Sequence, residues 1–205
     1  LLCVSRYFCK FIITLSLFIG ITRWRSESHY VDIVTSIRNR QWKEVEMHCN
    51  KARTSWYNLT PLGMPIAYYE GMALEYQNKP AIETFHSALK ASPWCKQVLT
   101  DLGRLEYKIK QNTDTAILFL QKAIKISPAY SYAYFNLAQL YIYEHEWQKA
   151  IEVLDMLDLD KKEHELKRMT WHYHHGETAD YYINKLVTTE RKTMHRIRKQ
   201  AETMQ

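Results

Sequence analysis

The chain has 205 residues, of which 46% are hydrophobic and 24% charged, as expected for one folded domain or a short array of repeats. Its net charge is +6, but the excess lies mainly after residue 160 and around a hydrophobic N-terminal segment. Nucleic-acid-binding proteins usually concentrate such charge on one stripe with aromatic residues between, so this class is not indicated. The four cysteines form no C-x-x-C pair and no Cys/His ligand spacing, and therefore indicate neither a zinc site nor a redox motif (Cys3, Cys9, Cys49 and Cys95).

An uncharged hydrophobic segment occupies residues 11–22. This segment alone is too short to cross a bilayer core, which needs about 20 residues. Extended from Tyr7 to Trp24 it becomes just long enough, provided that Lys10 reaches its ammonium group towards the headgroups. Trp24 stands between two arginines, which is typical of an interfacial anchor. We therefore expect residues 1–25 to be a transmembrane segment that contacts the membrane through residues 7–24.

Two other interpretations of this segment remain open. A secretory signal peptide has a similarly short apolar region, but residues 22–25 offer no small-x-small cleavage site. The segment could also be a buried helix of a soluble domain. Basic residues flank both ends, so the positive-inside rule predicts no orientation. The first residue is Leu1 rather than methionine, which is expected of a processed chain or of a fragment of a longer protein.

Residues 28–57 show a weak helical repeat, with residues 28–40 as its first helix and hydrophobic residues at helical spacing after Trp42. Two prolines and a glycine within residues 57–65 predict a loop after it.

Three stronger repeats follow over residues 64–162 and come into register on Ala81, Ala116 and Ala150. These alanines are 35 and 34 residues apart, and each is followed by large apolar residues at helical spacing. Pro93 and Pro128 should each end a helix, because proline cannot donate a backbone hydrogen bond, and the residue before each should be extended. The period and the A-x3-F…P pattern resemble the tetratricopeptide repeat (TPR) family, over about residues 28–162.

The resemblance implies an all-α fold, a TPR-type solenoid of helical hairpins preceded by one transmembrane helix. Each hairpin buries its apolar face only against its neighbours. The family's first helices line a groove that binds a protein or a peptide. The groove candidates in this chain are polar and aromatic residues of first helices: Lys96, Arg104, Asn136, Gln139 and Tyr143.

Residues 163–205 are expected to form capping helices, one over residues 163–175 and a long polar one over residues 177–204. The basic residues of the long helix could instead contact anionic lipids.

His172 and His175 could share one helix face, but no third ligand is evident, so no metal site is predicted. The sequence also lacks a glycine-rich phosphate loop, a nucleophile elbow and an H-E-x-x-H motif, which argues against an enzyme or a cofactor site in these residues.

A second resemblance rests on the order of motifs before the clear repeats. An apolar helix is followed by Arg23-Trp24-Arg25-Ser26-Glu27, then by Trp42, Asn58-Leu59-Thr60-Pro61-Leu62-Gly63 and Ile66-Ala67-Tyr68-Tyr69-Glu70-Gly71. This order resembles the C-terminal TPR region of bacterial O-antigen ligase/polymerase-like membrane proteins. It implies that the apolar segment is the last membrane helix of a longer protein in the bacterial inner membrane. No catalytic residue is carried over, because the family's catalytic loops have no counterpart here.

Two functions are therefore expected. The first is a membrane-anchored TPR scaffold that binds a protein or peptide, and the second is the accessory domain of an O-antigen ligase/polymerase-like glycosyltransferase. The sequence predicts no oligomeric state, no partner identity and no side of the membrane.

Overall fold

The computed structural model describes residues 2–54, 57–164, 166 and 177–204, with side chains from Phe11 onward in the first helix and from Ile183 onward in the last. The chain divides into two compact units, Leu1–Pro93 and Trp94–Gln205. Nearly all of the described residues outside the turns are α-helical, and the β pairing among them amounts to two isolated bridges near residues 54–65. The predicted all-α helical repeat is confirmed.

The first unit contains the helices α1 (Leu2–Arg38), α2 (Trp42–Ala52), α3 (Ile66–Tyr76) and α4 (Ile82–Ala91). Each helix packs against the next one along the chain. A fully buried cluster joins α1, α2 and α3: Ile33, Val45, Cys49, Ala52, Ile66 and Ala73. The predicted loop lies between α2 and α3, where the backbone turns through Gly63 at a φ of 74°.

The structure joins two segments that the sequence analysis separated. The segment expected to end at residue 25 and the helix expected to begin at residue 28 are a single helix, α1. No glycine or proline follows Gly20 within this helix, so the backbone has no reason to break there. Ser26 and Ser36 are buried on the face that packs on the rest of the unit, and Arg23 Nε donates to Glu27 Oε1 over 2.8 Å along the helix.

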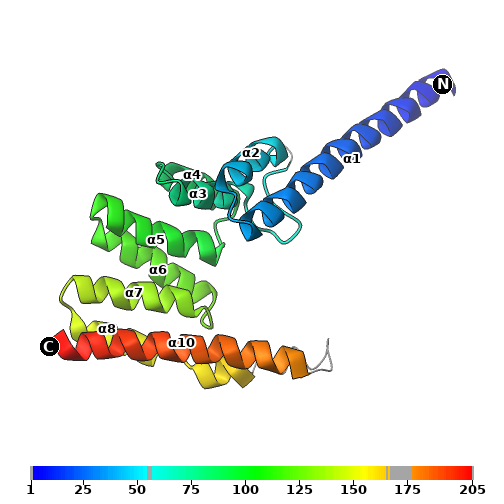
Figure 1. Cartoon of the computed structure of the whole chain (residues 1–205). Coiled ribbons are helices and arrows are strands. Elements are labelled where there is room, and N and C mark those ends of the chain that lie inside the picture. Colours follow the sequence, from blue (N-terminus) through cyan, green and yellow to red (C-terminus); the bar gives the residue numbers. More distant parts are fainter. Residues whose placement is uncertain (1, 55–56, 165, 167–176, 205) are drawn as a thin grey trace. The chain divides into compact units, whose positions relative to one another are not determined.

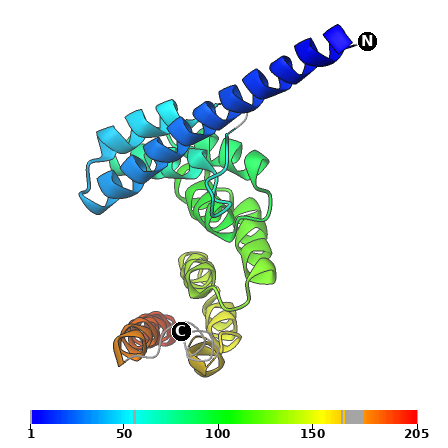
Figure 2. The same cartoon turned by 90° about the vertical axis from the view of Figure 1, so that its right-hand side faces the viewer.

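Residues 11–21 of α1 are uncharged and exposed. In two views it extends beyond α2 and α3 (Figures 1 and 2), and its large side chains between Phe11 and Trp24 are exposed. Within the described part of the chain, no helix is both long and apolar enough to cross a membrane. The predicted span begins at residue 7, and the side chains of residues 7–10 lie outside the described residues. The transmembrane prediction is therefore not confirmed.

The second unit contains α5 (Lys96–Lys110), α6 (Thr113–Ile126), α7 (Ser131–Tyr143), α8 (Trp147–Asp155) and α10 (Glu177–Met204). The helices α5 to α8 pack as successive antiparallel neighbours, and α10 lies against α7 and α8 (Figure 1). The buried core runs through this stack and includes Ala116, Leu120, Ala138, Ala150 and Leu154.

The turns within the helical pairs share one backbone feature. In each, a non-glycine residue adopts the left-handed conformation with a φ between 54° and 61° (Arg40, Asn78, Gln111 and His145). A left-handed residue after a helix reverses the chain and satisfies the last carbonyl groups. The second helices of two repeats end differently: Ser92 and Ser127 have φ values of −142° and −141° before Pro93 and Pro128. Their ψ values are both 87°, so these residues leave the helical region before the prolines without reaching the fully extended geometry that was predicted.

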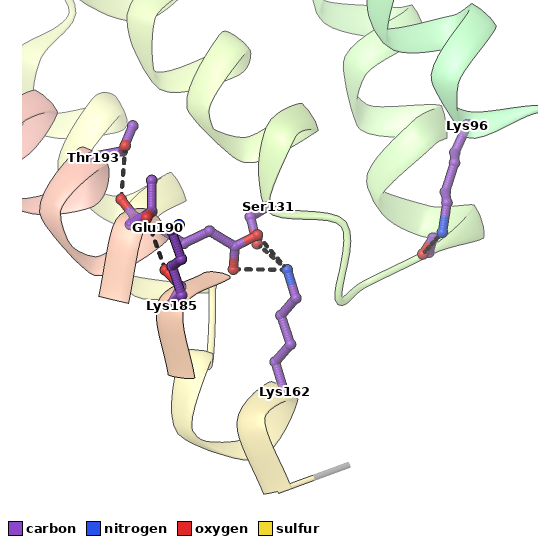
Figure 3. Close-up of polar contacts among 8 residues, drawn as sticks. Lys96, Ser131, Lys162, Lys185, Glu190 and Thr193 are labelled. Carbon is purple, nitrogen blue, oxygen red and sulfur yellow. Dashed lines mark hydrogen bonds and ion pairs between the residues drawn. The ribbon is translucent and has the colours of Figure 1, made fainter. Parts of the chain in front are cut away.

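The C-terminal helix α10 is amphipathic and docks through apolar side chains. Ile183, Val187, Ile197 and Ala201 are buried in the same core as α7 and α8. Beside them Lys162 Nζ donates to both oxygens of Glu190, over 2.6 and 2.7 Å, and to Ser131 Oγ over 2.7 Å (Figure 3). The predicted helix over residues 163–175 lies mostly outside the described residues.

Several basic residues of α10 have protein partners. Arg191 pairs with Asp160 and with Glu163, the latter over 2.9 Å, and Arg198 pairs with Asp155. These cations thus help to hold α10 on the second unit.

Candidate functional site

A hollow of about 540 Å³ lies in the second unit between the first helices of two repeats, α5 and α7. Leu120 and Leu140 contribute apolar surface to it, and the remaining lining is polar or aromatic: Arg104, Tyr107, Lys108, Gln111, Asn136, Gln139 and Tyr143. The helices α5 and α7 contact each other directly, and their side chains form most of the hollow, which Leu120 of α6 also reaches.

Two of its polar side chains are held in place by neighbours. Arg104 Nη2 lies 3.2 Å from Asp101 Oδ1, and the Asp101 side chain is only 11% exposed. Asn136 Nδ2 donates to the carbonyl of Tyr132 over 2.7 Å, one turn earlier in α7. A ligand would therefore meet groups that are already oriented, which lowers the entropy cost of binding.

A stacked tyrosine pair forms one wall of the hollow. The rings of Tyr107 and Tyr143 have centroids 5.9 Å apart and planes 5° apart. Burial, together with a hydrogen bond to Glu144, raises the pKa of Tyr107 above its usual value. Its hydroxyl group therefore stays protonated at neutral pH, and the wall offers an uncharged aromatic surface.

The charged groups that line the hollow are cationic. Arg104 and Lys108 are the two, and no carboxylate, histidine or cysteine is among the residues that line it. Asp101 lies beside the hollow but is paired with Arg104. The local charge suits an anionic ligand.

The structure brings four of the five predicted groove residues together in this hollow. These are Arg104, Asn136, Gln139 and Tyr143. Lys96 lies apart from them, at the first residue of α5 (Figure 3). Its Nζ donates to Ser127 Oγ over 3.0 Å and lies 5.0 Å from the centroid of the Tyr130 ring. It is two helical turns before Arg104, and so supports the α6–α7 connection rather than the hollow.

Sequence reasoning missed five lining residues: Tyr107, Lys108, Gln111, Leu120 and Leu140. Helical spacing could have found three of them, because Tyr107 and Lys108 follow Arg104 by three and four positions and Leu140 follows Asn136 by four. Leu120 belongs to a second helix, and no local pattern indicates that it reaches the hollow.

The first unit holds a separate group of polar side chains. His29 and Asp32 of α1 and His48 of α2 bring three potential metal-ligand atoms within 4.8 Å of one another. The pair considered in the sequence analysis, His172 and His175, lies outside the described residues.

Comparison with known proteins identifies the repeat. Residues 109–169 match the sequence profile of the tetratricopeptide repeat family, and this range contains α6, α7 and α8. Residues 109–169 are therefore tetratricopeptide repeat sequence. No curated protein sequence matches it significantly.

Solved TPR structures resemble the chain in fold. A TPR protein from Parabacteroides merdae is 17% identical, with a TM-score of 0.56 over 88% of this chain and 73% of that one. The TPR2B domain of yeast Sti1, in its complex with pHsp70, is 18% identical, with a TM-score of 0.50 over 68% of this chain and 95% of that one. YrrB, a TPR protein with an unusual peptide-binding site, is 20% identical, with a TM-score of 0.50 over 64% of this chain and 66% of that one.

These likenesses are too distant to carry more than the fold. None of them supports the resemblance to O-antigen ligase/polymerase-like proteins, and none supports a membrane segment.

Proposed function

We propose that this TPR protein is a binding scaffold that holds an extended, acidic peptide segment of a partner protein in the hollow between α5 and α7. The observation that carries the proposal is the composition of the hollow: two cations, three side-chain amides and a stacked tyrosine pair on the first helices of adjacent repeats. The Sti1 complex and the peptide-binding YrrB support it, because both share the fold.

The proposed contacts follow from the chemistry of each group. The carboxamides of Asn136 and Gln139 can both donate and accept, as the peptide backbone requires. Arg104 and Lys108 would bind a carboxylate, either of an acidic side chain or of a C-terminus. The tyrosine wall would pack on an apolar side chain of the peptide.

Peptide binding by the full chain tests this function. Fluorescence anisotropy with a library of acidic peptides, each with a free or an amidated C-terminus, should give micromolar ligands. Gln139→Ala should weaken the best ligand at least fivefold, whereas Gln121→Ala, at an exposed position of α6, should not change it. Equal affinities of the two variants would exclude the hollow as the binding site.

A second pair of variants tests the charge of the ligand. Lys108→Ala should weaken acidic peptides, and Lys125→Ala, an exposed lysine of α6 outside the hollow, is its matched control. Amidation of the peptide C-terminus and Lys108→Ala can each weaken binding. If both changes together weaken it no more than either one alone, the C-terminal carboxylate is the group that Lys108 binds.

Membrane anchoring through α1 is a second proposal, supported by one observation. Phe11, Phe18 and Ile21 are each more than 60% exposed, and the exposed apolar residues between 11 and 21 surround the helix instead of forming one stripe. A helix that is apolar on all sides is normally covered by protein or by lipid. We propose that lipid covers this part of α1.

Vesicle flotation tests this anchoring. The full chain should float with vesicles of phosphatidylethanolamine and phosphatidylglycerol, and Leu17→Glu/Phe18→Glu should release it. Leu118→Glu, at an apolar residue of α6 that is 63% exposed, should float like the parent. Equal flotation of all three would exclude α1 as the anchor.

The accessory-domain hypothesis stays a prediction. It requires that the reading frame upstream of Leu1 encode several further apolar segments, which sequencing of the locus would show.

A further inference from the structure

The hairpin of α1 and α2 brings two histidines and an aspartate to one point. His29 and Asp32 are three residues apart on α1 and so lie on the same face of that helix. His48 comes from α2, which runs back along α1 after the turn at residues 39–41. Both histidine side chains are 18% exposed and the Asp32 side chain is 47% exposed, so the group lies at the edge of the packed interface with one side open to solvent.

The three ligand atoms form a nearly equilateral triangle. His29 Nδ1 lies 3.3 Å from His48 Nδ1. Asp32 Oδ2 lies 3.5 Å from His29 Nδ1 and 3.4 Å from His48 Nδ1. The two contacts of Asp32 are longer than the usual range of about 2.7–3.2 Å for a hydrogen bond from nitrogen to oxygen. The two Nδ1 atoms are within hydrogen-bonding distance of each other. A hydrogen bond between the rings therefore does not account for the position of Asp32.

The same separations match ligands that share one tetrahedral metal ion. Zinc–nitrogen and zinc–oxygen distances of about 2.0–2.2 Å place two ligands of a tetrahedron about 3.3–3.6 Å apart. An octahedral ion with similar bond lengths would bring neighbouring ligands to about 3.0 Å, which is shorter than any of the three separations. We propose that His29, Asp32 and His48 form a binding site for a divalent transition-metal ion, with zinc as the preferred ion.

The ligand types agree with this geometry. Two imidazole nitrogens and one carboxylate oxygen are borderline ligands that suit zinc better than magnesium or calcium, which prefer oxygen alone. Both histidines would bind through Nδ1, which leaves the proton on Nε2 in each ring. The site supplies three ligands, and its exposed side leaves the fourth position to water or to a group of a partner.

The ion would join α1 to α2 by bonds that the hydrophobic contacts of the hairpin do not provide. Because it binds the folded hairpin and not the separated helices, it should raise the melting temperature of the first unit as the zinc concentration increases. This role is independent of the proposed peptide site, which lies in the second unit.

Isothermal titration with zinc tests the site. The parent for this experiment is the full chain with His172→Ala, His174→Ala and His175→Ala, because that run of histidines in the sequence could bind zinc by itself. It should bind one equivalent of zinc with micromolar affinity and gain several degrees in melting temperature. Asp32→Asn and His48→Ala should each weaken binding at least tenfold, whereas His195→Ala, an exposed histidine of α10, should not.

Cobalt(II) gives a second, geometric readout, since a tetrahedral cobalt complex absorbs visible light far more strongly than an octahedral one. The parent should show the strong tetrahedral bands, and Asp32→Asn should lose them. Should His48→Ala fail to fold, Asp32→Asn still decides the matter, because the substitution keeps the size of the side chain. Equal zinc affinity of the parent and Asp32→Asn, or a weak octahedral cobalt spectrum, would overturn the proposal.

Discussion

Gly103 lies at a close contact between α5 and α6. A Cβ atom at this position would lie 2.7 Å from Leu120 Cγ and 3.0 Å from the backbone oxygen of Ala116. Leu120 is fully buried and the carbonyl belongs to the helix backbone, so neither can move away cheaply. The residue is therefore required by the packing of two helices, not by its own backbone conformation.

Replacing Gly103 tests whether the packing of α5 on α6 requires a glycine. Gly103→Ala should lower the free energy of unfolding by about 1–3 kcal/mol, because it overpacks the α5–α6 contact. Urea denaturation followed by circular dichroism measures the change. Gly20→Ala is the control: nothing lies within 4 Å of its added Cβ, and alanine favours a helix, so it should not destabilise the protein.

Cys49 shows how burial controls reactivity at a single side chain. Burial, with Glu70 nearby, raises the pKa of the Cys49 thiol to about 12, and burial also raises the pKa of Cys95. Since the thiolate is the reactive form, both side chains should be inert in the folded protein.

Thiol labelling checks this expectation. In a Cys3→Ser/Cys9→Ser background, Ellman's reagent at pH 8 should react with Cys49 and Cys95 only as fast as the protein unfolds. Addition of urea should therefore accelerate labelling in parallel with the loss of helix. Immediate reaction of one or both thiols in the native protein would contradict the burial of that thiol.

At the scale of elements, a largely buried ion pair between Lys162 and Glu190 helps to hold α10 on the second unit. The Lys162 and Glu190 side chains are only 13% and 15% exposed, and Ser131, at the start of α7, shares the Lys162 ammonium group. Lys162 thereby connects Glu190 of α10 to Ser131 of α7. The other ion pairs of α10, through Arg191 and Arg198, are more exposed and contribute less.

Removing one side chain of an ion pair should cost more stability for the buried Lys162–Glu190 pair than for an exposed pair. Lys162→Met leaves the Glu190 carboxylate without its cation and should cost about 1–3 kcal/mol of unfolding free energy. Lys162→Met/Glu190→Gln should recover part of the loss, since no unpaired charge remains. Lys149→Met removes an exposed pair with Glu146 and should change stability by about 0.5 kcal/mol or less. A similar loss for Lys149→Met and Lys162→Met would show that burial of the pair is unimportant.

At the scale of the whole molecule, charge favours acidic partners. The net charge is +6, and the charged groups that line the hollow are cations. Long-range attraction of this kind mainly accelerates encounter and is screened by salt over about 8–10 Å at physiological ionic strength.

The kinetics of peptide binding should show this electrostatic attraction. Between 50 and 500 mM salt, the association rate constant of an acidic peptide should fall about tenfold or more, while its dissociation rate constant changes less. Stopped-flow fluorescence measures both constants. A salt-independent association rate would mean that charge does not guide binding, although the hollow could still bind a peptide through its amides.

The sequence by itself determined the repeat and its helices. Ala81, Ala116 and Ala150 mark the period, and Pro93 and Pro128 follow the ends of second helices. These features are local or strictly periodic, so helical spacing and turn chemistry are enough to predict them. The sequence divides α1 after residue 25, whereas in the structure the helix continues, because a change of hydrophobicity does not end a helix when no residue breaks the backbone.

Only the tertiary structure decided which side chains meet. Four predicted groove residues share a hollow, Lys96 does not, and Leu120 joins it from another helix. In the same way, no sequence pattern indicates that His48 reaches His29, because their approach depends on how α2 packs on α1. A period specifies which face of a helix is apolar, but the depth and rotation with which helices pack decide where their polar residues converge.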